Sequence, residues 1–477
     1  MSDRITRRRT LAALGATGIA GLAGCAGGNG GDETETSADT TAADTEASDD
    51  MDGTTTGSSG GASGTVKIGV LQPISGDLQY YGQQALWGFS SGLGYKAGAE
   101  PSVTAETGSQ TVTVGDVDYE LYIRDTQFSA DTSQTLATNL VTDEEVDMLF
   151  GCASSGAASR VSTTVAQQAG VPYMAGPAAS ASITGDSETC SDMVFRASEN
   201  TAMDARSGGK YVAQESDVSR VYLFGADYSF GRAVVNNYEQ VLTNEGVEIV
   251  GKRFVPQGYS EWEGLLDNAV EAGAEGIVGG FTVATLPSLF TTYLQGDYDF
   301  TVFGGFATAI TNNVIGGLLQ NQLGEPLTQE KLDGLGVGPF TTRYHWNQYD
   351  NEINSTFVDG YVNAYGRVPD LFTSGTFTAA SAIVQGVEAS GSTDGADIAE
   401  ALRGMTVADT PKGTDAYTFQ EYNNQARSQM TVADVVPTAD EWSDAWGAAV
   451  QPSDPVARIS ADETTIPADS DDMGCSL

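Results

Sequence analysis

The hydrophobic residues of this 477-residue chain fall in short runs that alternate with amphipathic stretches of helix length. From about Thr65 to Phe306 the apolar runs hold four to eight residues and are rich in Val, Ile, Tyr and Phe. Such alternation is typical of stacked βαβ units with a parallel sheet. Because the series begins again at Arg220, the pattern predicts two similar α/β lobes, each with its own sheet.

The apolar runs place the expected elements as follows. The first series predicts strands at 66–71, 119–125, 146–151 and 171–176, and helices from about 83, 130 and 156. The second predicts strands at 220–225, 247–254, 276–281 and 300–306, and helices ending near 246, starting at 261 and crossing 286–294. Two more helices, about 352–365 and 373–389, precede strand-like runs at 416–422 and 429–436. Additions of this kind complete one lobe and close a hinge.

The amino terminus reads as an export signal. In "TRRRTLAALGATGIAGLAGC" the arginines 7 to 9 precede a short apolar run that ends at Cys25. The run is shorter than the about 20 residues that span a bilayer. Arg7 and Arg8 resemble a twin-arginine signal, although the general secretory route stays open. Leu22–Cys25 looks like a lipobox, so we expect a lipid on Cys25 and a protein anchored on the extracellular face of the membrane; a chance cysteine is the alternative.

Residues 26–64 form an acidic Ser/Thr/Gly stretch without an aromatic residue, which predicts a disordered tether. The whole chain carries 64 acidic and 22 basic residues, for a net charge of −42. Such a charge repels nucleic acid, so no nucleic-acid partner is expected. A strongly acidic surface also favours a salt-loving host, because salt screens the self-repulsion. An acidic protein from an ordinary host remains the alternative.

In open α/β sheets ligands bind beyond the carboxyl ends of the strands. There the stretch "GCASSGAASR" enters a helix after Gly151, and Ser154 and Ser155 lie beside free backbone amides that favour a carboxylate. Simple helix capping explains one of the two serines. An enzyme is not expected, because Ala153 breaks the G-x-S-x-G pattern and the only histidine, His345, lies in a different segment. We expect neither a cofactor nor a metal site.

The stretches "VKIGVLQPISGDLQYYGQQALWGF", "DMLFGCASSGAASRVSTTVAQQAGVPYMAGPAAS" and "LFGADYSFGRA" resemble the branched-chain amino acid type of periplasmic solute-binding protein, here as a haloarchaeal-like lipoprotein. The resemblance implies two Rossmann-like lobes (periplasmic-binding-protein type I) joined by a three-segment hinge. It places lobe 1 at 65–197 and about 341–425, lobe 2 at 198–340 and about 426–440, and an acidic tail at 441–477. It also implies a monomer that delivers a small carboxylate or amide ligand to the permease subunits of an ABC importer.

The same resemblance assigns the ligand site residue by residue. On lobe 1 it places Ser154, Ser155, Ala179 and Ser180 around the ligand's carboxylate, with Tyr81 on the ligand's side chain. On lobe 2 the aromatic positions are Tyr228, Phe230 and Phe281. In this family an acidic residue binds the ammonium group of an amino acid ligand, and the matching position of this chain is Phe306. Either Asp227 replaces that acidic residue, or the ligand has no ammonium group. A sensor of amides or urea with the same fold, or a surface-coat protein, remains an alternative function.

The cysteine count suits an exported protein. With Cys25 lipidated, three cysteines remain, and we expect Cys190 to pair with Cys475 and Cys152 to be a buried thiol. The sequence alone leaves other pairings open.

Overall fold

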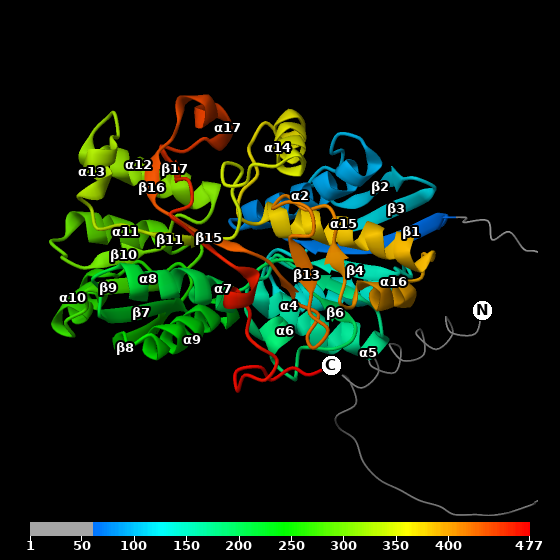
Figure 1. The fold of residues 1–477 in the computed structure, drawn as a ribbon, viewed down its shortest axis with the longest axis horizontal. Coiled ribbons are helices and arrows are strands. Elements are labelled where there is room, and N and C mark those ends of the chain that lie inside the picture. The colour runs from blue at the N-terminus through cyan, green and yellow to red at the C-terminus, as the bar shows by residue number, and fades with distance from the viewer. Residues whose placement is uncertain (1–60) are drawn as a thin grey trace, which may run out of the picture. The chain divides into compact units, whose positions relative to one another are not determined.

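The computed structural model of the protein describes residues 61–477. The expected export signal, Cys25 and nearly all of the expected tether therefore lie outside the described residues. Ala62–Leu477 form one unit built from two α/β lobes (Figure 1). No helix in this part of the chain is long and apolar enough to cross a membrane.

Lobe 1 is built on a six-stranded sheet of order β2-β3-β1-β4-β5-β6. All neighbouring strands run parallel except β2 and β3, which form an antiparallel pair at one edge. Its strands are β1 (Gly64–Gln72), β2 (Gly108–Val114), β3 (Val117–Asp125), β4 (Met148–Gly151), β5 (Tyr173–Ala175) and β6 (Val194–Phe195). Its helical segments are α2 (Gln79–Ala97), α3 (Ala130–Thr142), α4 (Ser155–Val161), η1 (Ser162–Ala166), α5 (Gln167–Ala169) and α6 (Ser182–Gly185).

Lobe 2 is built on a parallel four-stranded sheet of order β10-β9-β7-β8. Its strands are β7 (Arg220–Ala226), β8 (Glu248–Val255), β9 (Gly276–Gly280) and β10 (Thr301–Phe303). Its helical segments are α7 (Thr201–Asp204), η2 (Ala205–Gly209), α8 (Lys210–Glu215), α9 (Ser229–Asn244), α10 (Glu263–Glu271), α11 (Leu286–Gln295), α12 (Ala309–Leu323) and α13 (Gln329–Asp333). The predicted class, two Rossmann-like lobes with parallel sheets, is confirmed.

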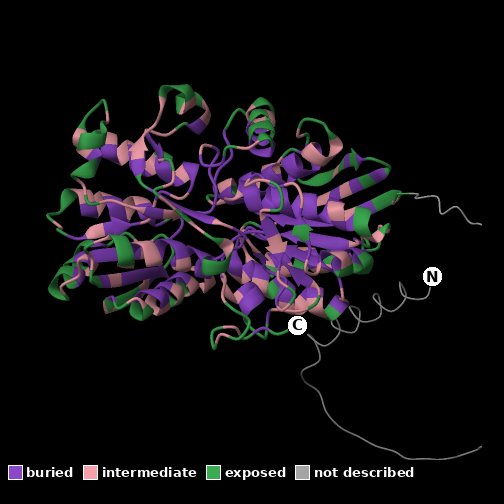
Figure 2. Ribbon diagram, viewed as in Figure 1, coloured by how far each residue is buried: buried purple, intermediate pink, exposed green. Residues whose placement is uncertain are grey.

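The chain after lobe 2 returns to lobe 1 and then crosses back. α14 (Glu352–Tyr365), α15 (Thr373–Ser390), α16 (Gly395–Leu402), β12 (Thr406–Val407), β13 (Tyr417–Phe419) and β14 (Ala426–Arg427) are added to lobe 1. The contact of α15 with α2 is close, because a Cβ at Gly92 of α2 would lie 2.4 Å from the Phe377 carbonyl oxygen. The sheet, α2, α15 and α16 share one apolar core, which Figure 2 shows as continuous burial.

Three segments cross between the lobes. The first is Arg196–Asn200, the second begins at Arg343 after β11 (Phe340–Thr342), and the third is Ser428–Gln429 before β15 (Met430–Ala433). β11 and β15 pair antiparallel and lie side by side, β11 leading out of lobe 2 and β15 leading into it (Figure 1). These three neighbouring segments form the hinge, and after β18 (Ala457–Ile459) the chain returns to lobe 1 once more, where Cys475 is bonded to Cys190.

The prediction that 441–477 form an acidic tail is wrong for much of this segment, which contains strands and helices. β16 (Val435–Pro437) pairs with β17 (Val450–Pro452), and β15 pairs with β18 (Ala457–Ile459). η3 (Asp440–Trp442), α17 (Ser443–Trp446) and α18 (Ala461–Thr464) complete the segment. The reason is apolar content, since Trp446 is buried and Val450 packs into the core of lobe 2. The expected Cys190–Cys475 disulfide is present, and Cys152 is a buried free thiol.

Candidate ligand-binding site between the lobes

A cavity of about 170 Å³ lies between the two lobes. Both lobes contribute aromatic rings to its wall. Lobe 1 provides Tyr81, Phe128 and Phe372, and lobe 2 provides Tyr228, Phe230, Phe281, Phe303 and Phe340. Most of these rings follow the carboxyl ends of sheet strands, which is where an open α/β sheet binds its ligand. The wall therefore suits a small ligand with an apolar or aromatic body.

Six of the residues singled out from the sequence line this cavity. They are Tyr81, Ser155, Ala179, Tyr228, Phe230 and Phe281. The hydroxyl of Tyr81 accepts a hydrogen bond from the Val283 amide of lobe 2, with an N–O distance of 3.0 Å. Its ring packs edge-on against Phe372, with the ring centroids 5.3 Å apart. Tyr81 therefore joins the two lobes and covers the cavity at the same time.

The two serines after β4 have different roles. Ser154 is the N-cap of α4, and its hydroxyl accepts the Ala157 amide at 3.4 Å, as helix capping predicts. Ser155 faces the cavity and accepts the Ser180 amide at 3.1 Å. Ser154 and Ser180 themselves do not line the cavity. Capping occupies the Ser154 hydroxyl, and hydrogen bonds within the loop occupy the Ser180 amide and hydroxyl.

Phe306 also lies outside the cavity, contrary to its assignment from the family pattern. The Phe306 ring is fully buried and packs against Phe290 and Phe340. Gly304 and Gly305 have φ angles of 108° and 91°, a turn that brings their own backbone to the cavity wall and sends Phe306 into the core of lobe 2. Asp227, the proposed substitute acid, is half exposed and pairs with Arg232, so it is not part of the wall either.

The charged residues of the cavity wall are Asp204 and Arg343, which the sequence reasoning missed. The Arg343 Nε and Nη2 atoms donate to the two carboxylate oxygens of Asp204 at 3.0 and 2.6 Å. Burial alone lowers the pKa of Arg343, but the charge and hydrogen bonds of Asp204 together with the charge of Glu199 outweigh burial and leave that pKa above its ordinary value. Because Arg343 lies on the second crossover and Asp204 follows the first, the pair sits beside the hinge.

Arg196 lies behind the lobe 1 loop that carries Ala179. Its guanidinium donates to the Ser180 carbonyl at 2.6 Å, the Ala178 carbonyl at 3.2 Å and the Gln425 side-chain oxygen at 2.5 Å. Arg196 is fully buried, and burial together with the nearby charge of Arg343 lowers its pKa to about 9. In the described part of the chain no carboxylate forms an ion pair with Arg196. The cavity therefore has a buried cation behind its wall.

A second contact between the lobes involves Asp370, which precedes α15. Its carboxylate accepts the Ala309 amide, at the start of α12 in lobe 2, at 3.1 Å, and it also accepts the Tyr80 hydroxyl. Burial raises the pKa of Asp370, and these hydrogen bonds offset that rise only in part. With the Tyr81–Val283 bond, this gives two hydrogen-bonded contacts between the lobes apart from the crossovers.

His345 gives a pH-dependent prediction. Burial lowers its pKa to about 3 and outweighs the opposite effect of the Ala307 backbone. The unfolded chain takes up a proton below about pH 6.5 while the folded protein does not, so stability should fall as pH drops from about 6.5 toward 3. This one group accounts for up to about 1.4 kcal/mol per pH unit.

The measurement compares the wild type with His345→Phe by urea unfolding at pH 7, 6 and 5. Both chains share the carboxylates, so the difference between them isolates His345. We expect the wild type to lose stability relative to the variant as pH falls. A constant difference at all three values would contradict the prediction.

The comparisons with known proteins agree with this geometry. A sequence model of the family described as periplasmic binding protein matches residues 65–441. No curated protein sequence matches the chain.

Among residues 61–477 no group of three or more His, Cys, Asp or Glu side chains is arranged to hold a metal ion.

Solved structures of several solute-binding proteins share the fold. The chain is similar to a solute-binding protein of an ABC transporter from Rhodopseudomonas palustris BisB5 in complex with 3,4-dihydroxybenzoic acid, with 18% identity, a TM-score of 0.65 and coverage of 83% of this chain and 98% of that one. An ABC-type branched-chain amino acid transporter from Rhodopseudomonas palustris CGA009 is 22% identical, with a TM-score of 0.62 and coverage of 84% and 98%. A leucine-binding protein from Thermotoga maritima MSB8 is 18% identical, with a TM-score of 0.65 and coverage of 83% and 99%.

Proposed function

The chain belongs to the periplasmic binding protein family, and on that premise we propose that it is the solute-binding receptor of an ABC importer for a small carboxylate or amide ligand. The observation that carries the proposal is the cavity between the lobes, which aromatic residues of both lobes enclose. In another protein an apolar cavity of about 150 Å³ takes up benzene, so about 170 Å³ suits a single ring or a branched aliphatic chain. The 3,4-dihydroxybenzoic acid bound in one structural relative and the leucine named for another are a single-ring and a branched aliphatic ligand of this kind.

The mechanism we propose is closure about the three crossovers. The ligand first docks on lobe 1 near Tyr81, Ser155 and Ala179, and the rings of lobe 2 then cover it. The hydrogen bonds from Val283 to Tyr81 and from Ala309 to Asp370 form only when the lobes meet. Ligand and interlobe contacts together favour the closed state, to the extent that the ligand binds it more tightly than the open state.

The proposed site of action is the extracellular face of the cell membrane, with a lipid on Cys25 as the anchor. This rests on the lipobox-like Leu22–Cys25 sequence, which lies outside the described residues. A Cys25→Ser chain should move from the membrane fraction to the medium. If it stays with the membrane, the anchor proposal fails.

The test of function is a thermal-shift and calorimetric screen of the full chain. The panel holds benzoate, 4-hydroxybenzoate, leucine, isoleucine, valine, benzamide and urea, each in high and low salt. A ligand must raise the melting temperature once its free concentration exceeds the dissociation constant. If no compound of any class binds, the receptor proposal fails and a sensor or surface-coat role gains support.

Tyr81→Phe tests the closure mechanism. The change keeps the ring in the cavity wall but leaves the Val283 amide without its acceptor in the closed state. A hydrogen bond of this kind contributes about 0.5 to 1.5 kcal/mol, so ligand affinity should fall about 2- to 10-fold. Calorimetry measures the loss.

The matched control is Tyr365→Phe, which removes a lobe 1 hydroxyl that donates to the Val103 carbonyl within the same lobe. This variant should bind ligand as the wild type does. If Tyr81→Phe leaves the affinity unchanged, or if the control loses as much, the Tyr81 hydroxyl has no part in closure.

A further inference from the structure

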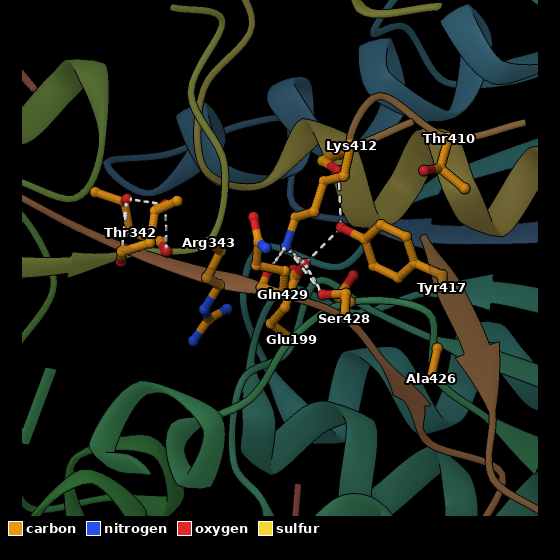
Figure 3. Close-up of polar contacts among 12 residues, drawn as sticks. Glu199, Thr342, Arg343, Thr410, Lys412, Tyr417, Ala426, Ser428 and Gln429 are labelled. Atoms are coloured by element: carbon orange, nitrogen blue, oxygen red, sulfur yellow. Dashed lines mark hydrogen bonds and ion pairs between the residues drawn. The ribbon is translucent and has the colours of Figure 1, made fainter. Parts of the chain in front are cut away.

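The guanidinium of Arg343 has one nitrogen left for a ligand. Nε and Nη2 are bound to Asp204, whereas Nη1 has no hydrogen-bond partner among the described residues. The Arg343 side chain lines the cavity, and Figure 3 shows it pointing away from the buried cluster around Glu199. The planar guanidinium forms strong, charge-assisted hydrogen bonds with carboxylate groups. A ligand carboxylate in the cavity therefore has a charged donor available at Nη1.

The buried charges beside the hinge also favour an anion. The cations Arg196, Arg343 and Lys412 lie near the carboxylates Glu199 and Asp204, and the third buried carboxylate, Asp370, lies at the other contact between the lobes. Arg196 is the cation without a carboxylate partner, and its guanidinium binds the carbonyl groups of the loop that presents Ala179 to the cavity. A monoanionic ligand would be attracted to this cation, because opposite charges attract strongly where water is excluded.

The described wall of the cavity offers no carboxylate that is free to bind an ammonium group of the ligand. Asp204 is the carboxylate of the wall, and Arg343 engages both of its oxygens. Asp370, a further buried carboxylate near the cavity, is not in the wall and accepts the Tyr80 hydroxyl and the Ala309 amide. Burying an ammonium without a partner costs several kcal/mol, so an amino acid would bind less well than the matching acid without the ammonium.

We propose that Arg343, supported by the buried Arg196, anchors the ligand's carboxylate and restricts this receptor to monoanionic acids that carry no ammonium group. This proposal rests on the proposed receptor function and adds the residues that determine which ligands the receptor binds. Asp204 has a positioning role, because its two hydrogen bonds fix the plane of the Arg343 guanidinium and leave Nη1 directed to the ligand.

The first experiment uses the wild-type full chain and two matched pairs of probes in calorimetry. 4-Methylpentanoate and leucine differ by the ammonium, and benzoate and benzamide differ by the negative charge. We expect at least one acid to bind, and each acid that binds to bind at least about ten-fold more tightly than its partner, as a charged hydrogen bond implies. Leucine or benzamide binding as tightly as its acid would overturn the proposal and leave the receptor function standing. If none of these four probes binds, and no compound of the wider panel binds either, the proposed receptor function is wrong.

The second experiment uses the double variant Asp204→Asn/Arg343→Gln, which removes both charges and so leaves neither buried ion alone. The preference for benzoate over benzamide should fall about 10- to 100-fold, because the charged donor is gone. Affinity for benzamide should stay within a few-fold of the wild type. Arg232→Gln is the matched control, since its guanidinium pairs with Asp227 outside the cavity. An unchanged preference in the folded double variant would overturn the role of Arg343; if the variant does not fold, the matched probe pairs on the wild type still decide the proposal.

Discussion

A chain with Cys475→Ser should lose roughly 5 kcal/mol of unfolding free energy relative to the disulfide-bonded protein. The Cys190–Cys475 bond joins residues 285 positions apart. A loop of about 100 residues already gives about 4.7 kcal/mol in the chain-entropy account, and longer loops add slowly. The bond also attaches the last residues to lobe 1, where the Leu477 amide donates to the Tyr422 carbonyl at 3.0 Å.

Urea unfolding in the presence and absence of a reducing agent measures this effect. The oxidised wild type should be the most stable form, and the reduced wild type should approach the Cys475→Ser variant. Cys190→Ser should match Cys475→Ser, and a reducing agent should change neither variant further. A loss under about 1 kcal/mol would show that the unfolded chain is already constrained in other ways.

Strands and lobes were predictable because each buried strand is an apolar run. All four residues of β4, for example, are buried. The bounds of α14 were correct because Asn351 caps its start and Gly366, with a φ of 66°, ends it. The edge strand β2 was missed because its sequence, GSQTVTV, is polar and mostly exposed, so it forms through pairing with β3. Helix α12 was also missed, since its apolar residues follow a weakly periodic pattern.

The ligand site was only partly predictable, because a local sequence pattern locates residues that follow a strand but not pairs of residues that are distant in the sequence. Tyr81, Phe230 and Phe281 follow strands, so their place at the edge of a sheet could be inferred locally. The pairing of Asp204 with Arg343 joins residues 139 positions apart, one at the end of α7 and one on the second crossover, and no local pattern marks it. The family pattern supplied positions on the lobes and none on the crossovers. The charged pair at the hinge could therefore be identified only in the three-dimensional structure.

Lys412→Met should cost about 3 to 5 kcal/mol of unfolding free energy, because it leaves Glu199 as an unpaired buried charge. The Lys412 ammonium lies 2.7 Å from the Glu199 carboxylate, and both side chains are 1% exposed. Burial alone would raise the pKa of Glu199, but the charge and hydrogen bond of Lys412 hold it below its ordinary value. Figure 3 shows the cluster, in which Lys412 also binds the Ser428 hydroxyl at 2.9 Å and the Gln429 carbonyl at 2.6 Å.

This cluster ties two crossovers to lobe 1, since Glu199 lies on the first and Gln429 on the third. In the proposed closure, the lobes therefore rotate beyond these residues, on the lobe 2 side of the crossovers. The double variant Glu199→Gln/Lys412→Met should recover most of the stability, because it removes both buried charges. Lys252→Met is the surface control; its 2.7 Å pair with Glu239 is about half exposed and should contribute at most about 1 kcal/mol. Equal losses from the single and double variants would mean that packing, and not the unpaired carboxylate of Glu199, sets the stability of the hinge.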